Sequence, residues 1–515
     1  MKAVPHNDPL EIEVADFGPI VQAKVDLRPL TVFVGPSNTG KSYLAILVYA
    51  LHRCFSSGAW PGHWRFSRGP HMFRNERRRQ LSRKTIHALA VLAQQWLTDE
   101  KESPLGGNIA LTGPVADEIH SIFDAQGDQL GNEISRCFGI GGTEGLIRKG
   151  NNDCARVIFR RPFSGGSIPD EHLLTIGKQE TTFRASIPKD ASIQIDAGWG
   201  GRSLDYLRHT VENMVSNAAK GDKERNFFAW QLIEVLAGFF APRHVVGPLR
   251  LPAFYLPADR TGVMHAHSAV VSAMIGNAPT AGLRPTTHTP MLSGVLADFL
   301  QQLIELDDPV FQRSKPRRDL GRKIENAILE GSVHVNRSDI TGYPRFTYRP
   351  EGWKNDLPLM NTSSMVSEIA PVVLYLRHMV GPDSLLIVEE PESHLHPAMQ
   401  VEFTRQLAML VRSGVRVLVT THSEWVLEEL ANTVRRSALP EASREDIANA
   451  DVALSPSDVG AWLFKPKRRP RGSVVEEVKL DEETGLYPTD YDAVSEALYN
   501  ESASIFNRIQ DSNPR

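Results

Sequence analysis

The sequence predicts an α/β fold in which buried strands carry polar motifs to one edge of a sheet. Three apolar runs support this class. Residues 30–34 precede a glycine-rich loop, residues 385–388 precede a group of glutamates, and residues 415–420 precede a histidine. Strands buried on both faces are continuous apolar runs, and α/β sheets bind ligands at the carboxyl ends of their strands. We therefore expect the three motifs to act together.

The first motif is a phosphate-binding loop. It reads Gly35-Pro36-Ser37-Asn38-Thr39-Gly40-Lys41-Ser42, the G-x-x-x-x-G-K-S or Walker A pattern, between an apolar strand and a helical run. The glycines let backbone N–H groups face an anion, and the helix N-terminus adds partial positive charge. Lys41 is predicted to contact the β- and γ-phosphates of ATP, and Ser42 to bind Mg²⁺. Tyr43 completes the predicted nucleotide-binding segment.

The second motif is an acidic strand end, Glu389-Glu390-Pro391-Glu392. An apolar strand that ends in acids is a Walker B pattern. Glu389 is predicted to hold Mg²⁺, directly or through water, and Glu390 to polarise the attacking water as a general base. The alternative, an acidic turn after a strand, is disfavoured because a phosphate-binding loop lies upstream.

The third motif is Thr421-His422-Ser423, after the strand at 415–420. A histidine at the tip of a neighbouring strand can hydrogen-bond the γ-phosphate and the attacking water. We therefore predict that His422 is a catalytic sensor, together with Lys41 and Glu390.

Length and composition indicate a soluble protein of more than one lobe. The chain has 515 residues and a formal net charge of −4, which argues against a uniformly basic nucleic-acid coat. Three scattered cysteines suit a reducing cytoplasm, and we predict a cytoplasmic location. No apolar run reaches about 18 residues, so we expect no membrane span.

Four segments are predicted. Residues 1–60 form the N-terminal part of the ATPase core, and residues 61–240 a mostly helical insertion. Residues 241–464 form the C-terminal part of the core, and residues 465–515 a tail that completes the core or docks a partner.

Two basic clusters and one arginine leave alternatives open. The clusters are solvated helix faces or contacts for a phosphate backbone or a partner protein. Arg260, after an apolar strand, either reaches a phosphate or forms a structural salt bridge. The clusters comprise Arg74, Arg77, Arg78, Arg79, Arg83 and Lys84, and then Arg313, Lys315, Arg317, Arg318, Arg322 and Lys323.

These motifs resemble an ABC-type ATPase of the SMC/RecF-like branch. The sequence is most similar to AAA-family ATPases of bacterial anti-phage systems and to the ATPase half of the overcoming-lysogenization-defect (OLD) nucleases. Besides the three motifs, the resemblance is carried by Phe17-Gly18-Pro19-Ile20, Leu256-Pro257-Ala258-Asp259-Arg260, Ser363-Ser364-Met365-Val366-Ser367-Glu368 and Ser393-His394-Leu395-His396-Pro397. Glu389 stands where ABC proteins usually carry Asp.

The resemblance implies further roles. Ser363 and Ser364 match the signature segment that touches the γ-phosphate of the opposite subunit, and residues 393–396 match the D-loop at the dimer seam. A head-to-head homodimer with two sandwiched ATP molecules is therefore implied.

We expect an ATP-hydrolysing switch that senses or engages nucleic acid or a phage product and controls a separate effector. The rival hypotheses are a nuclease with an unrecognised metal site and a DNA-repair ATPase of RecF type. A transporter subunit and a non-hydrolysing scaffold are disfavoured by the atypical signature and by Glu390.

Overall fold

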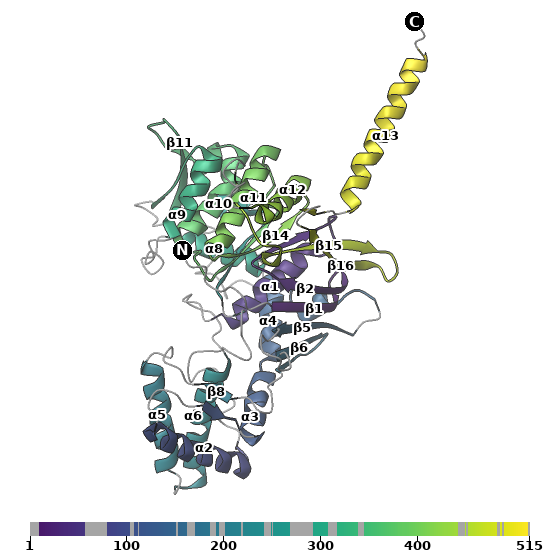
Figure 1. The fold of residues 1–515 in the computed structure, drawn as a ribbon. Coiled ribbons are helices and arrows are strands. Elements are labelled where there is room, and N and C mark those ends of the chain that lie inside the picture. Colours follow the sequence, from purple (N-terminus) through teal and green to yellow (C-terminus); the bar gives the residue numbers. More distant parts are fainter. Residues whose placement is uncertain are drawn as a thin grey trace, which may run out of the picture.

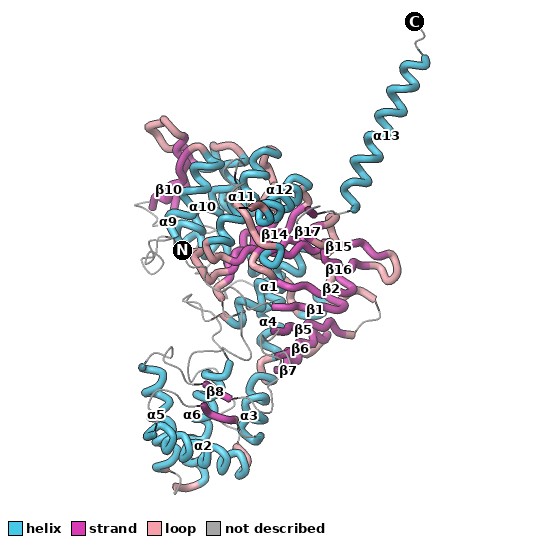
Figure 2. Tube along the Cα trace, in the orientation of Figure 1, coloured by secondary structure: helices cyan, strands magenta, loops and turns pink. Residues whose placement is uncertain are grey.

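The computed structural model describes most of the chain in separate stretches. They are residues 10–56, 80–102, 108–111, 113–150, 153–161, 170–185, 192–194, 201–217, 220–241, 249, 251–267, 292–306, 317–337, 344–440, 449, 452–481, 485–486 and 489–512. Figure 1 shows their arrangement and Figure 2 their secondary structure.

One mixed sheet of 11 strands organises the described residues, in the order β7-β6-β5-β1-β2-β16-β15-β3-β14-β13-β9. Its parallel part contains β15 (Val459–Lys467), β3 (Leu30–Val34), β14 (Arg416–Thr421), β13 (Leu385–Glu389) and β9 (Ala253–Leu256). Its other strands are β16 (Gly472–Val478), β2 (Ile20–Leu27), β1 (Leu10–Phe17), β5 (Cys154–Arg161), β6 (Asp170–Gly177) and β7 (Thr181–Ala185). The predicted α/β class is confirmed.

The register of the parallel strands aligns the three motifs. Val34 is opposite Thr421, and Thr420 is opposite Glu389. Side chains alternate between two hydrophobic cores, since Phe33 packs in one core and Val32 and Val34 in the other. The sheet is therefore covered on both faces, and its motif-bearing strand ends share one edge.

Helices cover the two faces of the sheet (Figure 1). Residues of α1 and α4 belong to one core, and residues of α10, α11 and α12 belong to the other. These helices are α1 (Lys41–Phe55), α4 (Gly127–Phe138), α10 (Ser364–His378), α11 (Pro397–Arg412) and α12 (Glu424–Arg435). The remaining elements of this part are α8 (Gly294–Ile304), α9 (Arg317–Ile324), a π-helical turn (Glu325–Leu329), β10 (Gly331–Arg337), β11 (Pro344–Pro350), β12 (Leu357–Pro358), β17 (Leu480–Asp481) and β18 (Gly485–Leu486).

The segment predicted as a mostly helical insertion, residues 61–240, contains both strands and helices. Its strands β5, β6 and β7 extend the main sheet beyond β1. Its helices α2, α3, α5 and α6, with β8, gather at the end of the molecule opposite α10–α12 (Figure 1). Their bounds are α2 (Arg83–Glu102), β4 (Asn108–Ala110), α3 (Gly113–Asp124), β8 (Ser192–Gln194), α5 (Gly201–Ser216) and α6 (Asp222–Ala241).

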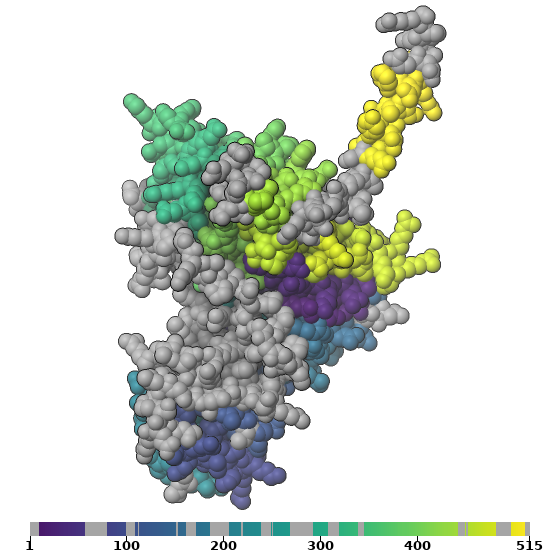
Figure 3. Space-filling model, in the orientation of Figure 1, coloured from purple at the N-terminus to yellow at the C-terminus, as the bar shows by residue number. Residues whose placement is uncertain are grey.

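The C-terminal strands support the phosphate-binding loop directly. The Ser473 hydroxyl donates to the Thr39 carbonyl at 2.5 Å, and a Cβ at Gly35 would lie 2.5 Å from the Phe464 carbonyl oxygen. β16 therefore belongs to the core, although it lies in the predicted tail. After it, α13 (Thr489–Ser512) stands clear of the body in the space-filling view (Figure 3).

Arg260 joins three elements and settles the alternative that the sequence left open. Its guanidinium is 0% exposed and forms an ion pair with Glu368 of α10. It also donates to the carbonyls of Glu389 at 2.6 Å, Pro257 at 3.0 Å and Glu390 at 3.3 Å. A fully buried guanidinium that is bonded in this way is a structural salt bridge, so Arg260 is not a phosphate contact in this conformation.

We expect Arg260→Met to lower the free energy of unfolding by about 3–5 kcal/mol, because Glu368 would keep a buried charge without its partner. Arg349→Met is the matched control, since Arg349 pairs with Asp356 at the surface. That change should cost at most about 1 kcal/mol. Chemical denaturation of the full chain measures both values, and equal losses would contradict the role of Arg260.

Candidate nucleotide site

The backbone of the phosphate-binding loop requires its glycines. Gly35 has φ +135° and Gly40 has φ +101°, both in a region that side chains rarely adopt. A Cβ at Gly40 would also lie 2.7 Å from the Ile20 side chain. Pro36, Ser37 and Asn38 are exposed at the tip, and Asn38 is left-handed with φ +63°.

Lys41 begins α1 and is held by the loop itself. Its Nζ donates to the carbonyl oxygens of Gly35 at 2.8 Å and Pro36 at 2.9 Å. Burial lowers the pKa of Lys41 to about 8, although Glu390, Glu392 and Glu389 favour its charged form. The ammonium group thus lies inside the loop and electrostatically close to the acidic strand end.

The two predicted Mg²⁺ ligands are brought together. Glu389 ends β13 and is buried, and burial raises the pKa of its carboxyl group above its usual value. A hydrogen bond from the Ser42 side chain opposes this rise, as does a bond from the Ala258 N–H at 3.3 Å. A hydroxyl beside a buried carboxylate is an oxygen donor set that suits Mg²⁺. These residues therefore fit the metal that the sequence implies.

Glu390 and His422 face each other across the ends of β13 and β14. Their side chains are half-buried, with 3.6 Å between Glu390 Oε1 and His422 Nε2. Contact with His422 lowers the pKa of the Glu390 carboxyl group below its usual value. Glu390 has φ +42°, a left-handed conformation that costs free energy for a non-glycine residue.

Glu392 holds the backbone of His422 in place, a contact that the sequence motif did not reveal. Its Oε1 accepts a hydrogen bond from the His422 backbone N–H at 2.6 Å, and burial raises the pKa of its carboxyl group. The only sequence signal for this contact was the position of Glu392 within the acidic motif.

The segment that matches the D-loop is an exposed turn. Ser393 N–H donates to Glu390 O at 3.0 Å, and Leu395 N–H donates to Glu392 O at 3.0 Å. His394 has φ +61°, and His396 caps α11. The turn leaves His394 and His396 on the surface, directly beside the acidic strand end.

The segment that matches the signature begins α10. Ser363 caps this helix by accepting a hydrogen bond from the Val366 N–H at 3.3 Å, and Ser363 and Ser364 are both exposed. Four residues further on, Glu368 is buried against Arg260. The same guanidinium thus contacts α10 and the carbonyls of the acidic strand end.

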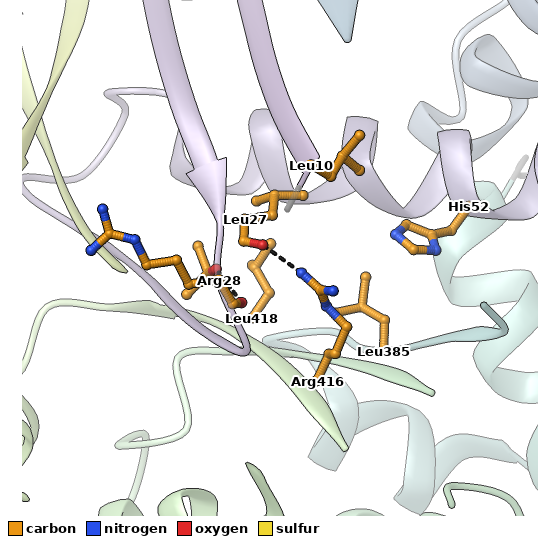
Figure 4. Close-up of a pocket in the computed structure, with 8 residues that line it drawn as sticks. Leu10, Leu27, Arg28, His52, Leu385, Arg416 and Leu418 are labelled. Atoms are coloured by element: carbon orange, nitrogen blue, oxygen red, sulfur yellow. Dashed lines mark hydrogen bonds between the residues drawn. The ribbon is translucent and has the colours of Figure 1, made fainter. Parts of the chain in front are cut away.

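A small cavity lies at the opposite end of the parallel strands. It is lined by residues that include Leu27, His52, Leu385 and Arg416, and Arg416 donates to the Leu27 carbonyl at 2.5 Å (Figure 4). Burial lowers the pKa of His52 to about 4, so this imidazole is neutral near pH 7. With about 10 Å³ of internal space, the cavity has room for one water molecule at most.

Part of the predicted basic surface lies outside the described residues, namely Arg74, Arg77, Arg78, Arg79, Arg313 and Lys315. Arg83 and Lys84 begin α2, while Arg322 and Lys323 lie near the end of α9.

Across the described ranges, no group of three or more His, Cys, Asp and Glu side chains is arranged to hold a metal ion. No helix within those ranges has the length and apolarity that a membrane span requires.

Comparisons with known proteins identify the ATPase part. A family model of the AAA ATPase domain matches residues 271–427, which include the signature segment, the acidic strand and His422. Protein ea59 of Escherichia phage lambda is 31% identical over 104 residues, which are 20% of this chain and 20% of that protein. The aligned part is thus about a fifth of each protein.

Solved structures give weaker similarities. An SMC head bound to the C-winged helix domain of ScpA has a TM-score of 0.39 at 9% identity, covering 92% of this chain and 99% of that one. The SMC head domain from Thermotoga maritima has a TM-score of 0.33 at 10% identity, covering 91% and 98%. With such TM-scores, the fold assignment depends instead on the strand order and the loop geometry above. The strand order and loop geometry, together with the family match, support an ATPase, and residues 271–427 are similar to the AAA ATPase domain.

Proposed function

We propose that the chain is an ATP-driven switch whose nucleotide site is formed by residues 35–43, Glu389, Glu390 and His422. The observation that carries this proposal is the meeting of the three motifs at one sheet edge, with Ser42 bonded to Glu389 and Glu390 facing His422. Bound ATP would supply the scissile phosphoanhydride, and Mg²⁺ would neutralise charge on its phosphates.

The chain's own groups divide the work between binding and water activation. Lys41 would exchange its two loop carbonyls for phosphate oxygens, while Ser42 and Glu389 hold the metal. His422 lowers the pKa of Glu390, and a weakly basic carboxylate suits a group that orients the attacking water more than one that binds its proton tightly. His422, fixed through its backbone by Glu392, would sense the γ-phosphate.

Two exposed apolar side chains support a head-to-head dimer. Met360, three residues before Ser363, is 63% exposed, and Trp425, three residues after His422, is 51% exposed. Large apolar side chains beside polar motifs are typical of surfaces that become buried on association. We propose that these residues belong to the ATP-dependent seam, together with Ser363, Ser364 and residues 393–396.

The proposed output is control of a separate effector in anti-phage defence, in the cytoplasm, with nucleic acid or a phage product as the trigger. The support is the sequence resemblance, and the assigned groups all serve one reaction, ATP hydrolysis. An ATP-driven change of shape does not by itself damage a target, so a partner chain would carry out the destructive reaction. The alternatives remain a nuclease with an unrecognised metal site and a RecF-type repair ATPase.

We expect ATP affinity to fall as pH rises above about 8, because Lys41 then loses its proton in the free protein. Phosphate oxygens favour the charged ammonium, so binding would take up a proton, and affinity would fall up to about tenfold per pH unit. Titration with a non-hydrolysable ATP analogue measures this slope. The Lys41→Arg variant stays charged, so its affinity for the analogue should not change with pH. An equal pH dependence of affinity in the wild type and the variant would assign the titration to another group.

We expect Glu390→Gln to bind ATP and hydrolyse it about 10²–10⁴-fold more slowly, because the carboxylate that activates water is lost. The closed state should accumulate, measured as an ATP-dependent increase in cross-linking between copies. Lys41→Ala should abolish nucleotide binding or hydrolysis. Normal ATP turnover by Glu390→Gln would assign the role of general base to Glu389 or Glu392.

The seam is tested in the same Glu390→Gln background. Trp425→Asp should remove the ATP-dependent increase in cross-linking. Trp353→Asp is its control, since Trp353 is 58% exposed but follows β11, away from the motifs in sequence. An equal effect of both changes would remove Trp425 from the seam.

We expect the pure protein to hydrolyse ATP and to leave DNA and RNA intact with Mg²⁺ or Mn²⁺, and to gain a destructive activity only with a partner chain. Incubation with labelled nucleic acids, with and without proteins from the neighbouring genes, tests this. Cleavage by the isolated protein that survives Lys41→Ala would favour the nuclease hypothesis.

A further inference from the structure

The helix α13 presents an apolar face to solvent, interrupted at its centre by Ser502. It spans Thr489–Ser512 and stands clear of the body (Figures 1 and 3). Five large apolar side chains on its described part are between 52% and 74% exposed: Leu498, Tyr499, Ile505, Phe506 and Ile509. Isolated helices are marginal in water, so a helix of this kind gains stability when another surface covers its apolar face.

The five side chains share one face of the helix. At about 100° per residue, they fall within about 120° of one another, with Leu498, Ile505 and Ile509 in one row and Tyr499 and Phe506 beside it. Asn500 and Asn507 lie on the opposite face. The apolar stripe is thus narrow enough to pack against one other helix and wide enough to exclude water from it.

Two charged residues border this face on the same edge. Glu501 and Arg508 are seven residues apart, which is two helical turns, so they point in nearly the same direction. In an antiparallel helix pair, equivalent edges of the two helices meet. In a parallel pair, each edge of one helix meets the opposite edge of the other. Glu501 and Arg508 of one copy would then face Tyr499 and Phe506 of the second.

We propose that the apolar face of α13 binds the same face of α13 in a second copy of this chain, as an antiparallel pair. Centred on the stripe from Leu498 to Ile509, the pair would bring Glu501 of each copy within about 3 Å, along the axis, of Arg508 of the other. Two opposite-charge pairs then lie along one side of the apolar seam. A parallel pair would bury Glu501 beside an aromatic ring without such a partner.

The size of this contact sets its strength. Three to four turns of paired helix bury on the order of 1,000 Å² in total, the lower limit for a specific interface. The pair should therefore form in a concentration-dependent manner and without ATP. By tethering two chains, it would raise the effective concentration at which their ATPase cores meet. This contact does not depend on the proposed head-to-head seam.

Sedimentation of the full chain without nucleotide tests the proposal over a range of protein concentrations. We expect a monomer–dimer equilibrium for the wild type and at least a tenfold weaker dimer for Ile505→Glu. Asn507→Glu is the matched control, since it adds the same charge to the opposite face of the helix. ATP turnover per chain at high concentration checks that the variants are folded.

Charge exchange tests the orientation. Glu501→Arg and Arg508→Glu should each weaken the dimer, and the double variant should restore it, because the antiparallel pair joins these two residues across the copies.

Three results would overturn the proposal: a monomeric wild type, an Ile505→Glu dimer as strong as the control, or a double variant whose dimer is no stronger than those of the single variants. A monomer that associates through α13 only with a protein from a neighbouring gene would assign the face to that partner. ATP-dependent cross-linking of Glu390→Gln that survives Ile505→Glu would keep the two contacts separate.

Discussion

The buried guanidinium of Arg260 is the interaction on which the geometry of the site depends. It is fully buried, and its N–H donors are divided among the acidic strand end, the turn after β9 and the start of α10. The carbonyls of Glu389 and Glu390 are therefore fixed relative to Glu368, five residues after Ser363. Because one planar group joins these elements, a shift of α10 cannot leave the carboxylates unmoved. The guanidinium therefore joins the start of α10 directly to the acidic strand end.

Three glutamates in one short motif have different environments, and these separate their tasks. Burial raises the pKa of Glu389 and Glu392, whereas contact with His422 lowers that of Glu390. Glu389 faces Ser42, Glu392 accepts a backbone N–H, and only Glu390 is half-exposed toward the histidine. Groups whose environments drive their pKa values apart are suited to distinct chemical roles.

Local motifs could be predicted from the sequence, but long-range pairings could not. The strand, loop and helix around Lys41 follow from residues 30–55 alone, as do α11 and β14, because glycine, proline and apolar runs act locally. The addition of β5–β7 to β1, and of β16 to β2, depends on antiparallel and crossover pairing between distant segments. Nothing in the residues around Arg260 indicated whether its partner would be a phosphate or a carboxylate. Glu368 was hidden for a similar reason, since a helix start predicts exposure, and only tertiary packing buries it.

The support of the phosphate-binding loop by β15 and β16 has a consequence during synthesis. β3 ends at Val34 and lies between β14 and β15, which begin only at Arg416 and Val459, so its neighbours are made long after it. Ser473 and Phe464, which brace Thr39 and Gly35, come still later than His422. A nascent chain therefore carries the whole Walker A sequence long before it can form the pocket, and contacts of such high sequence separation are slow to close. Until β15 and β16 have been synthesised, the loop lacks the contacts of Phe464 and Ser473 that hold Gly35 and Thr39 in place.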